Sequence, residues 1–106
     1  MSRAVVLGEK RNITAFKGVG IDALPVEDGQ KLFQSLMELS RERELGIVLV
    51  TENLAEQAPE AIEEFRRRSA AVLCIIPTHE GSRRTSFQAI SRLVESSLGI
   101  DILGKD

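Results

Sequence analysis

Three short apolar runs most constrain what this chain can fold into. They are AVVL (4–7), GIVLVTE (46–52) and VLCII (72–76), and they are rich in β-branched residues. Continuous apolar runs of this length are typical of strands that are covered on both faces of a sheet. A weaker strand is expected around Ala23–Val26, where Pro25 restricts it to a sheet edge because proline cannot donate to the ladder of hydrogen bonds.

Helical patterns lie between the expected strands at 4–7, 23–26 and 46–52. The first is a short helix that Asn12 is expected to cap and that Gly18 and Gly20 are expected to end. The second begins after Asp28, a favourable capping residue, and its apolar side chains recur at helical spacing. These side chains are Leu32, Phe33, Leu36, Met37 and Leu39.

Two further helices are expected after the 46–52 run. Asn53 is placed to cap one turn at 54–57, and Pro59 then starts a main helix that ends at Arg68. Acidic residues come first in this helix and three arginines come last, which suits the helix dipole, so the arginines are interpreted as a helix-end feature. The last helix is expected from about Ser86 to Leu98.

Strands that alternate with helices of this length pair in parallel through right-handed crossovers. The chain is therefore predicted to be an α/β protein, a small doubly wound (Rossmann-like) sheet of four parallel strands with helices on both faces and an amphipathic C-terminal helix. A length of 106 residues allows a single domain, 1–106. Within it we expect a sheet core over 1–78, and a loop and helix over 79–106 that one connection holds and that can therefore undock.

Charge and composition exclude several classes of function. The net charge is −2, and the residues up to and after Asn53 each contain 7 basic and 8 acidic side chains. There is no basic excess for nucleic acid, and with only four Phe and no Tyr or Trp the chain is poor in side chains that stack on bases. No apolar run approaches the roughly 20 residues of a membrane span, so direct membrane insertion is not expected. Cys74, the only cysteine, is interpreted as a small buried side chain in a reducing cytosol.

Two glycine patterns resemble nucleotide-binding motifs but stand in the wrong context. Gly18–Ala23 fits a dinucleotide fingerprint as text, yet a helix precedes it and a strand follows, the reverse of what pyrophosphate binding needs. Gly99–Lys105 fits a phosphate loop, but Asp106 follows where a magnesium-binding hydroxyl is required. We therefore expect no cofactor and no nucleotide site.

Other chemically suggestive residues do not assemble into a catalytic or metal site. His79 is the only histidine and has no second ligand nearby for zinc, so no metal is expected. Arg83 and Arg84 precede a helix start and could hold an anion, although a solvated loop is favoured. The chain is accordingly predicted not to be an enzyme by itself.

A small receiver-like signalling or ligand-binding module is the alternative hypothesis. Such a module would bind its ligand at the carboxyl ends of the strands. The residues there would be Gly8, Glu9, Thr51, Glu52 and Pro77. Receiver chemistry is not supported, because the 46–52 strand ends in Thr51-Glu52 where an aspartate must accept phosphate.

Five segments taken together resemble the F subunit of V-type and A-type rotary ATPases, of the bacterial or archaeal kind. They are AVVLGEK (4–10), FKGVGIDA (16–23), GIVLVTENLAEQAPEAIEEF (46–65), IIPTHEG (75–81) and LGIDI (98–102). The resemblance covers nearly the whole chain, and it depends on the order and spacing of the segments rather than on one motif. The RERE stretch (41–44) and the SRRTS loop (82–86) depart from the family pattern.

The resemblance implies a non-catalytic rotor part of the central stalk. In that family, the F subunit binds the coiled-coil axle, which is the D subunit, and the pair turns within the ring that hydrolyses or synthesises ATP. The catalytic ring and the subunits that connect to the membrane ring are the further implied partners, and the coupled process is proton or sodium-ion transport. The implied location is cytoplasmic and peripheral to the membrane, as part of a membrane-bound complex.

An apolar stripe near the end of the chain is the expected contact with the axle. An amphipathic helix at the margin of a small sheet can place its apolar face on a partner helix, although about half of such a stripe can also be core. The predicted partner-binding residues are Phe87, Ile90, Leu93, Val94, Leu98, Ile100 and Ile102.

Overall fold

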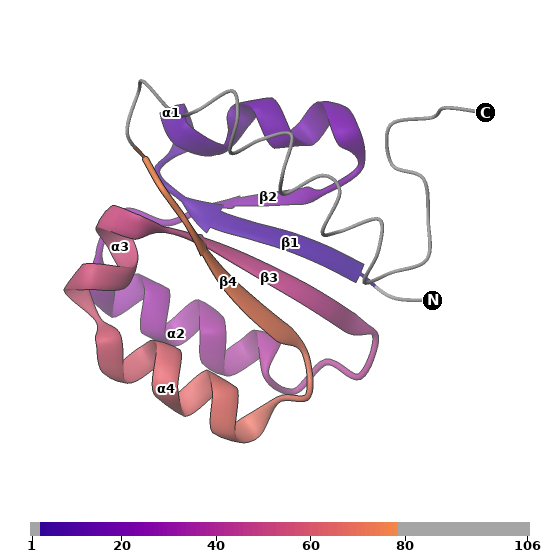
Figure 1. The fold of residues 1–106 in the computed structure, drawn as a ribbon, viewed down its shortest axis with the longest axis vertical. Coiled ribbons are helices and arrows are strands. Elements are labelled where there is room, and N and C mark those ends of the chain that lie inside the picture. Colours follow the sequence, from indigo (N-terminus) through magenta and orange to yellow (C-terminus); the bar gives the residue numbers. More distant parts are fainter. Residues whose placement is uncertain (1–2, 79–106) are drawn as a thin grey trace.

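A four-stranded sheet runs through residues 3–78, which are the residues that the computed structural model describes (Figure 1). The strands are β1 (Arg3–Gly8), β2 (Asp22–Pro25), β3 (Leu45–Thr51) and β4 (Val72–Ile76). Every neighbouring pair is parallel, and the order across the sheet is β2-β1-β3-β4. The predicted parallel α/β sheet is confirmed, and Pro25 lies at the end of an edge strand as expected.

Helices cover both faces of this sheet. They are α1 (Lys10–Ile13), the 3-10 helix η1 (Thr14–Val19), α2 (Gly29–Leu39), α3 (Glu52–Gln57) and α4 (Pro59–Arg68). Figure 1 shows α1 and the turns that follow it on one side of the strands, with α2 and α4 on the other. The prediction of helices on both faces is therefore confirmed within the described residues.

Alternate residues of the central strands belong to two apolar cores. Val5, Val48 and Val50 pack with α2, α3 and α4, whereas Val6 and Leu49 pack with α1 and η1. All five side chains are completely buried. This double burial explains why the sequence runs of β1 and β3 are apolar at every position rather than at every second one.

Helix α2 forms as its sequence pattern predicts. Asp28 lies in extended backbone before the helix, and its Oδ1 accepts a hydrogen bond of 2.9 Å from the N–H of Lys31. Such a cap satisfies one of the unpaired N–H groups of a first helical turn. The buried side of the helix holds Leu32, Leu36 and Leu39, while the two remaining apolar residues, Phe33 and Met37, lie half-buried at its margin.

Two predicted caps are wrong. Asn12 lies inside α1, which begins at Lys10 after Glu9, and Asn53 lies inside α3, which begins at Glu52 after Thr51. Neither capping position makes a side-chain cap bond. In each case an extended residue, Glu9 or Thr51, directly precedes the helix, so the helix starts before the residue with the better capping propensity.

The strand expected at 46–52 is displaced by one residue, to Leu45–Thr51. Pro59 is the first residue of α4, as expected, and its missing N–H would have had no helical partner there. The predicted final helix, about Ser86 to Leu98, and the predicted division between 1–78 and 79–106 involve residues outside the described part of the chain.

Candidate interaction surfaces

The predicted axle-binding stripe lies outside the described residues. This applies to all seven side chains, Phe87, Ile90, Leu93, Val94, Leu98, Ile100 and Ile102. It applies also to His79 and to the Arg83-Arg84 pair. The structure therefore bears on the other candidate surfaces, which belong to residues 3–78.

The carboxyl ends of β1 and β3 form the point where the strand order reverses, the usual ligand position in a doubly wound sheet. Here the space directly beside Gly8 is occupied by side chains of Thr51 and Ile13. A Cβ atom on Gly8 would lie 2.5 Å from Cγ2 of Thr51 and 2.7 Å from Cγ2 of Ile13. Glycine is therefore required for close packing, and these contacts leave little room beside Gly8 for the ligand that the alternative hypothesis places there.

Three side-chain oxygens near this end are buried without a hydrogen-bond partner among the described residues. They are Oε1 of Glu9, Oγ1 of Thr51 and Oδ1 of Asn53. Oε1 of Glu9 nevertheless lies 3.4 Å from Nε of Arg11, whose side chain is exposed, so the two groups form an ion pair. No group of three or more His, Cys, Asp and Glu side chains within residues 3–78 is arranged to hold a metal ion.

The glycines of the apparent dinucleotide fingerprint end a helix, as interpreted from the sequence. Gly20 follows η1 with φ of 81°, in the left-handed region, and β2 begins two residues later. Gly18 lies inside η1 and has no positive φ, so only one of the two glycines supplies left-handed backbone. No helix start follows the motif at this point, and pyrophosphate would have no helix N-terminus to meet.

The arginine run at the end of α4 is engaged with its own helix and with β4. Glu64 forms ion pairs with Arg68 and Arg67, and these hydrogen bonds lower the pKa of the Glu64 carboxyl. Arg66 donates a hydrogen bond of 3.1 Å from Nη2 to the carbonyl of Leu73. The interpretation of these arginines as a helix-end feature is confirmed.

A second ionic cluster lies at the amino ends of β1 and β2. Arg3 donates to Asp22 at 2.7 Å and to Glu42 at 2.5 Å, which joins β1 to β2 and to the segment before β3. These two hydrogen bonds, first with Glu42 and then with Asp22, raise the pKa of the Arg3 guanidinium. The cluster is exposed, so we interpret it as structural support rather than as a binding site.

Strand β4 leaves apolar surface uncovered. Val72 and Ile75 are both 46% exposed and are the large hydrophobic side chains of residues 3–78 that remain exposed to this degree. Cys74, between them, is a free and half-buried thiol, so the expectation of a fully buried cysteine is wrong. The difference arises because β4 lies at the edge of the sheet, where packing on both faces is incomplete.

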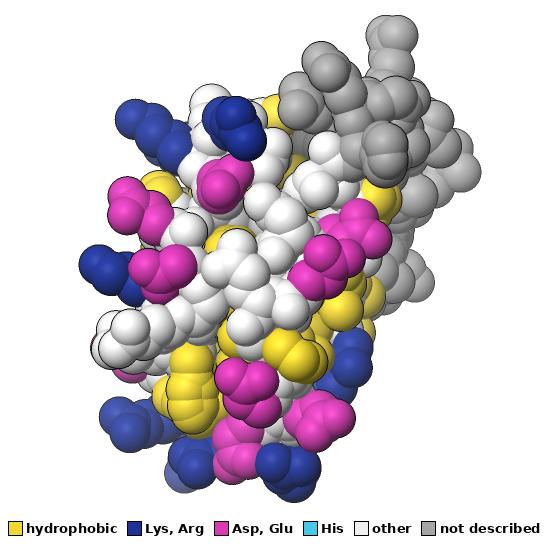
Figure 2. Space-filling view, turned by 90° about the vertical axis from the view of Figure 1, so that its left-hand side faces the viewer, with side chains coloured by type: hydrophobic (Ala, Val, Ile, Leu, Met, Phe, Trp, Pro, Cys, Tyr) yellow, Lys and Arg dark blue, Asp and Glu magenta, His cyan; other side chains and the backbone are white. Residues whose placement is uncertain are grey.

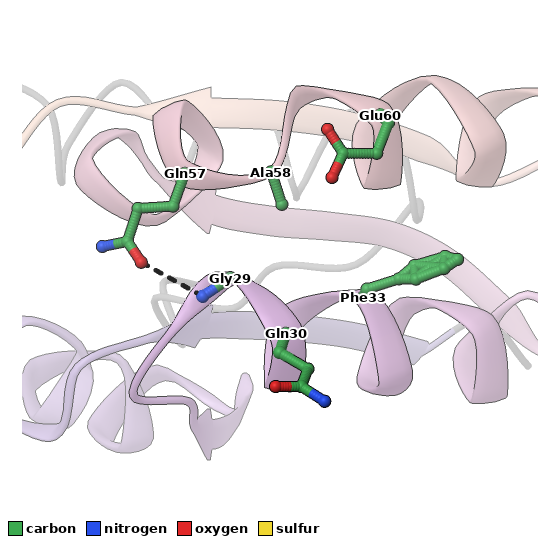
Figure 3. A pocket seen from close by; sticks show the side chains of 6 residues that line it. All are labelled: Gly29, Gln30, Phe33, Gln57, Ala58 and Glu60. Carbon is green, nitrogen blue, oxygen red and sulfur yellow. Dashed lines mark hydrogen bonds between the residues drawn. The ribbon is translucent and has the colours of Figure 1, made fainter.

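A groove of about 430 Å³ lies between the start of α2 and the junction of α3 with α4 (Figure 3). Its lining consists of Gly29, Gln30, Phe33, Gln57, Ala58 and Glu60. The Oε1 atom of Gln57 accepts a hydrogen bond of 3.1 Å from the N–H of Gly29, which links the two sides at one end. Sequence patterns do not predict this groove, because it depends on how closely two helices approach in space.

Glycine at position 29 permits that approach. A Cβ there would lie 3.1 Å from Cβ of Gln57 and 3.3 Å from Cβ of Ala58. Figure 3 shows the ring of Phe33 on α2 across from the first turn of α4, where Glu60 is found. The groove therefore combines an apolar wall, two amide side chains and a carboxylate.

Comparison with known proteins identifies the family. A family model described as the ATP synthase (F/14-kDa) subunit matches residues 4–94. The chain belongs to this family. The match spans most of the sequence, and the resemblance that the five sequence segments indicated is confirmed.

Two bacterial relatives are similar over nearly their whole length. The V-type ATP synthase F subunit of Clostridium botulinum is 32% identical over 98 residues, which are 92% of this chain and 94% of the relative. The protein of the same description from Fusobacterium nucleatum is 30% identical over 103 residues, 97% of each chain. An A-type ATP synthase F subunit from Methanococcus maripaludis is 24% identical over 101 residues, 94% of this chain and 98% of the relative.

A solved structure has the same fold. The V-type ATP synthase F subunit from Archaeoglobus fulgidus superposes with a TM-score of 0.59 and 15% sequence identity, covering 72% of this chain and 99% of that one. This likeness agrees with the α/β sheet described above. Among residues 3–78, no helix is long and apolar enough to cross a bilayer.

Proposed function

We propose that the protein is a non-catalytic rotor subunit in the central stalk of a V-type or A-type ATPase or ATP synthase. The observation that carries the proposal is the family match over residues 4–94, together with relatives named as V-type ATP synthase F subunits that align over 94% or more of their length. The role is to bind the coiled-coil axle subunit and to help couple ATP hydrolysis or synthesis to proton or sodium-ion transport. The catalytic ring and the membrane-ring connector are the neighbouring partners.

The absence of a properly placed phosphate loop in the sequence supports a non-catalytic role. The two glycine patterns lack either the strand-turn-helix context or the hydroxyl that a nucleotide site requires. We place the protein on the cytoplasmic side, peripheral to the membrane and held there by its partners. Nucleotide would be bound by the ring and not by this chain.

Within this proposal, residues 86–102 provide much of the axle contact. The apolar residues Ile90, Leu93 and Val94 recur at helical spacing, which is the pattern of an amphipathic helix that can place its apolar face on a partner. Ile90 and Val94 are four positions apart, so a helix places them on one face. Their replacement removes apolar area from a single patch.

The test is the double variant Ile90→Ser/Val94→Ser, with two measurements on the purified full chain. We expect affinity for the axle subunit to fall about tenfold or more, since each fully buried aliphatic side chain contributes roughly 1.5–3 kcal/mol. Gln88→Ser/Arg92→Ser is the matched control, because those positions lie on the other side of the same helical pattern. A variant that melts earlier but binds the axle with unchanged affinity would refute the assignment of this segment as the partner face.

The wider proposal is tested by assembly. The full chain, mixed with the axle subunit encoded by the same organism, should form a stable complex that enters the catalytic ring, and the chain alone should hydrolyse no ATP. Failure to associate with the axle subunit would overturn the rotor role itself.

A further inference from the structure

We propose that the groove between α2 and α4 is a second docking surface, which receives a basic side chain and an adjacent apolar side chain from a helix of another subunit. The inference rests on the proposed function, because the neighbouring subunits of the ATPase supply the partner. The residues that line this surface fall between Gly29 and Glu60, so none of them belongs to the 86–102 segment. The groove volume of about 430 Å³ lies within the range of specific binding pockets, roughly 300–1,000 Å³.

The apolar part of the groove comes from two side chains that the core does not fully cover. Phe33 packs against the core under α2 and α4 but remains half-buried, and Ala58 contributes its methyl group at the α3–α4 junction. An aromatic ring held at one edge by the core is a rigid surface with little conformational entropy to lose on binding. It is suited to contact an aliphatic side chain of a partner helix.

The helix starts that border the groove offer little to an anion. The N–H of Gly29 donates to Gln57 and the N–H of Lys31 donates to Asp28. At the start of α4, Pro59 has no N–H, and the N–H of Ala61 donates to the carbonyl of Ala58 at 3.0 Å. Since most of the donors that would hold a phosphate or carboxylate are already engaged, the charge of the surrounding side chains decides what the groove attracts.

Those side chains are predominantly acidic. Glu60 lines the groove, Glu56 precedes the lining residue Gln57, and Glu63 lies one helical turn beyond Glu60. All three are exposed. Glu56 and Glu60 form no ion pair with another side chain of residues 3–78, whereas Glu63 interacts electrostatically with Arg67 and helps to raise the pKa of its guanidinium. Lys31 is the nearby basic residue, also exposed. The two unpaired carboxylates of Glu56 and Glu60, against the one lysine, favour a partner that carries lysine or arginine.

The same combination is visible on the surface. Figure 2 faces the side of the molecule where the strands end. In the region of α2 and α4 it shows acidic side chains beside exposed hydrophobic ones, with Lys and Arg side chains around them. A basic side chain would pair with these carboxylates while its apolar neighbour covers the Phe33 ring. This is the arrangement of an apolar anchor with a charged rim that protein interfaces use.

Charge reversal at the groove tests the inference. The variants Glu60→Lys and Glu56→Lys should each bind the ATPase complex lacking this subunit about tenfold more weakly, with the difference shrinking as salt is raised. Glu38→Lys is the matched control, since Glu38 is also exposed and lies on α2 away from the groove. Phe33→Ala, with its melting temperature measured alongside, should weaken binding in a way that salt does not reverse.

The partner is identified by photo-crosslinking within the assembled complex. A photoreactive phenylalanine derivative at position 30, in place of Gln30 on the groove lining, should join the chain to a lysine- or arginine-bearing helix of another subunit. Two results would overturn the inference: groove variants that assemble as well as Glu38→Lys, or cross-links only between two copies of this chain. If the unaltered chain still assembles into the complex in those cases, only the docking role of the groove is refuted and the rotor role stands. If the unaltered chain does not join the complex at all, both the docking role and the rotor role are refuted.

Discussion

The two faces of the sheet differ in how much of the fold they hold. Among residues 3–78, sixteen buried residues form the cluster under α2, α3 and α4, and eight form the cluster under α1 and η1. The first face is covered by two helices of ten or more residues, the second by a four-residue helix and a six-residue 3-10 helix. Within residues 3–78, the apolar core is therefore larger on the α2–α4 side than on the α1–η1 side.

The substitution with the largest expected effect tests the burial of β3, a central strand that is covered by both apolar clusters. Leu49 in β3 is fully buried, so Leu49→Asp introduces an unpaired charge at a cost of several kcal/mol, comparable to the stability of a small domain. We expect no folded protein by circular dichroism. Ile75→Asp in β4 is the control, since Ile75 is 46% exposed and should tolerate the charge. Cooperative melting of the Leu49 variant would contradict the burial of β3.

The next effect compares one aromatic residue from each face. Phe65 of α4 is fully buried in the larger cluster, so Phe65→Ala should lower the free energy of unfolding by about 3–5 kcal/mol. Phe16 of η1 is 6% exposed and belongs to the smaller cluster. We expect Phe16→Ala to cost less, at or below the low end of that range, because a short 3-10 segment can relax into the space left behind. Urea titrations of both variants measure the difference, and equal losses would show that the faces contribute alike.

The smallest effect examines how the weaker face is built. Gly20 has φ of 81°, so Gly20→Ala should destabilise the protein by about 1–2 kcal/mol through backbone strain alone. Gly18 is two residues earlier, has no positive φ and has no atom within 4 Å of a built Cβ. Gly18→Ala should therefore be neutral or slightly stabilising, because it reduces the entropy of the unfolded chain. The melting temperatures of the Gly20→Ala and Gly18→Ala variants test this difference. Equal melting temperatures would contradict a left-handed backbone conformation at Gly20.

Sequence patterns predicted the elements better than their boundaries. The strands expected at 4–7 and 72–76 and the helix from Pro59 to Arg68 were confirmed as elements. The expected cover on both faces holds for 4–7 but is wrong for 72–76, because β4 lies at the sheet edge and leaves Val72 and Ile75 exposed. Helix starts at Asn12 and Asn53 were wrong because the chain turns into each helix directly after an extended residue, Glu9 or Thr51, that precedes the better capping residue. The axle-binding stripe at 86–102 stays a prediction.

By itself, the sequence determined the fold class and the family of this protein. Apolar runs that need cover on both faces favour a parallel sheet with helices on each side. The order of the segments along the sequence indicates the family of ATP synthase F subunits. Only the tertiary structure decided how the surfaces differ. The packing of Thr51 and Ile13 against Gly8, and the groove between Gly29 and Ala58, each depend on a distance between residues far apart in the chain. Such distances are set by the packing of whole elements, which local periodicity does not encode.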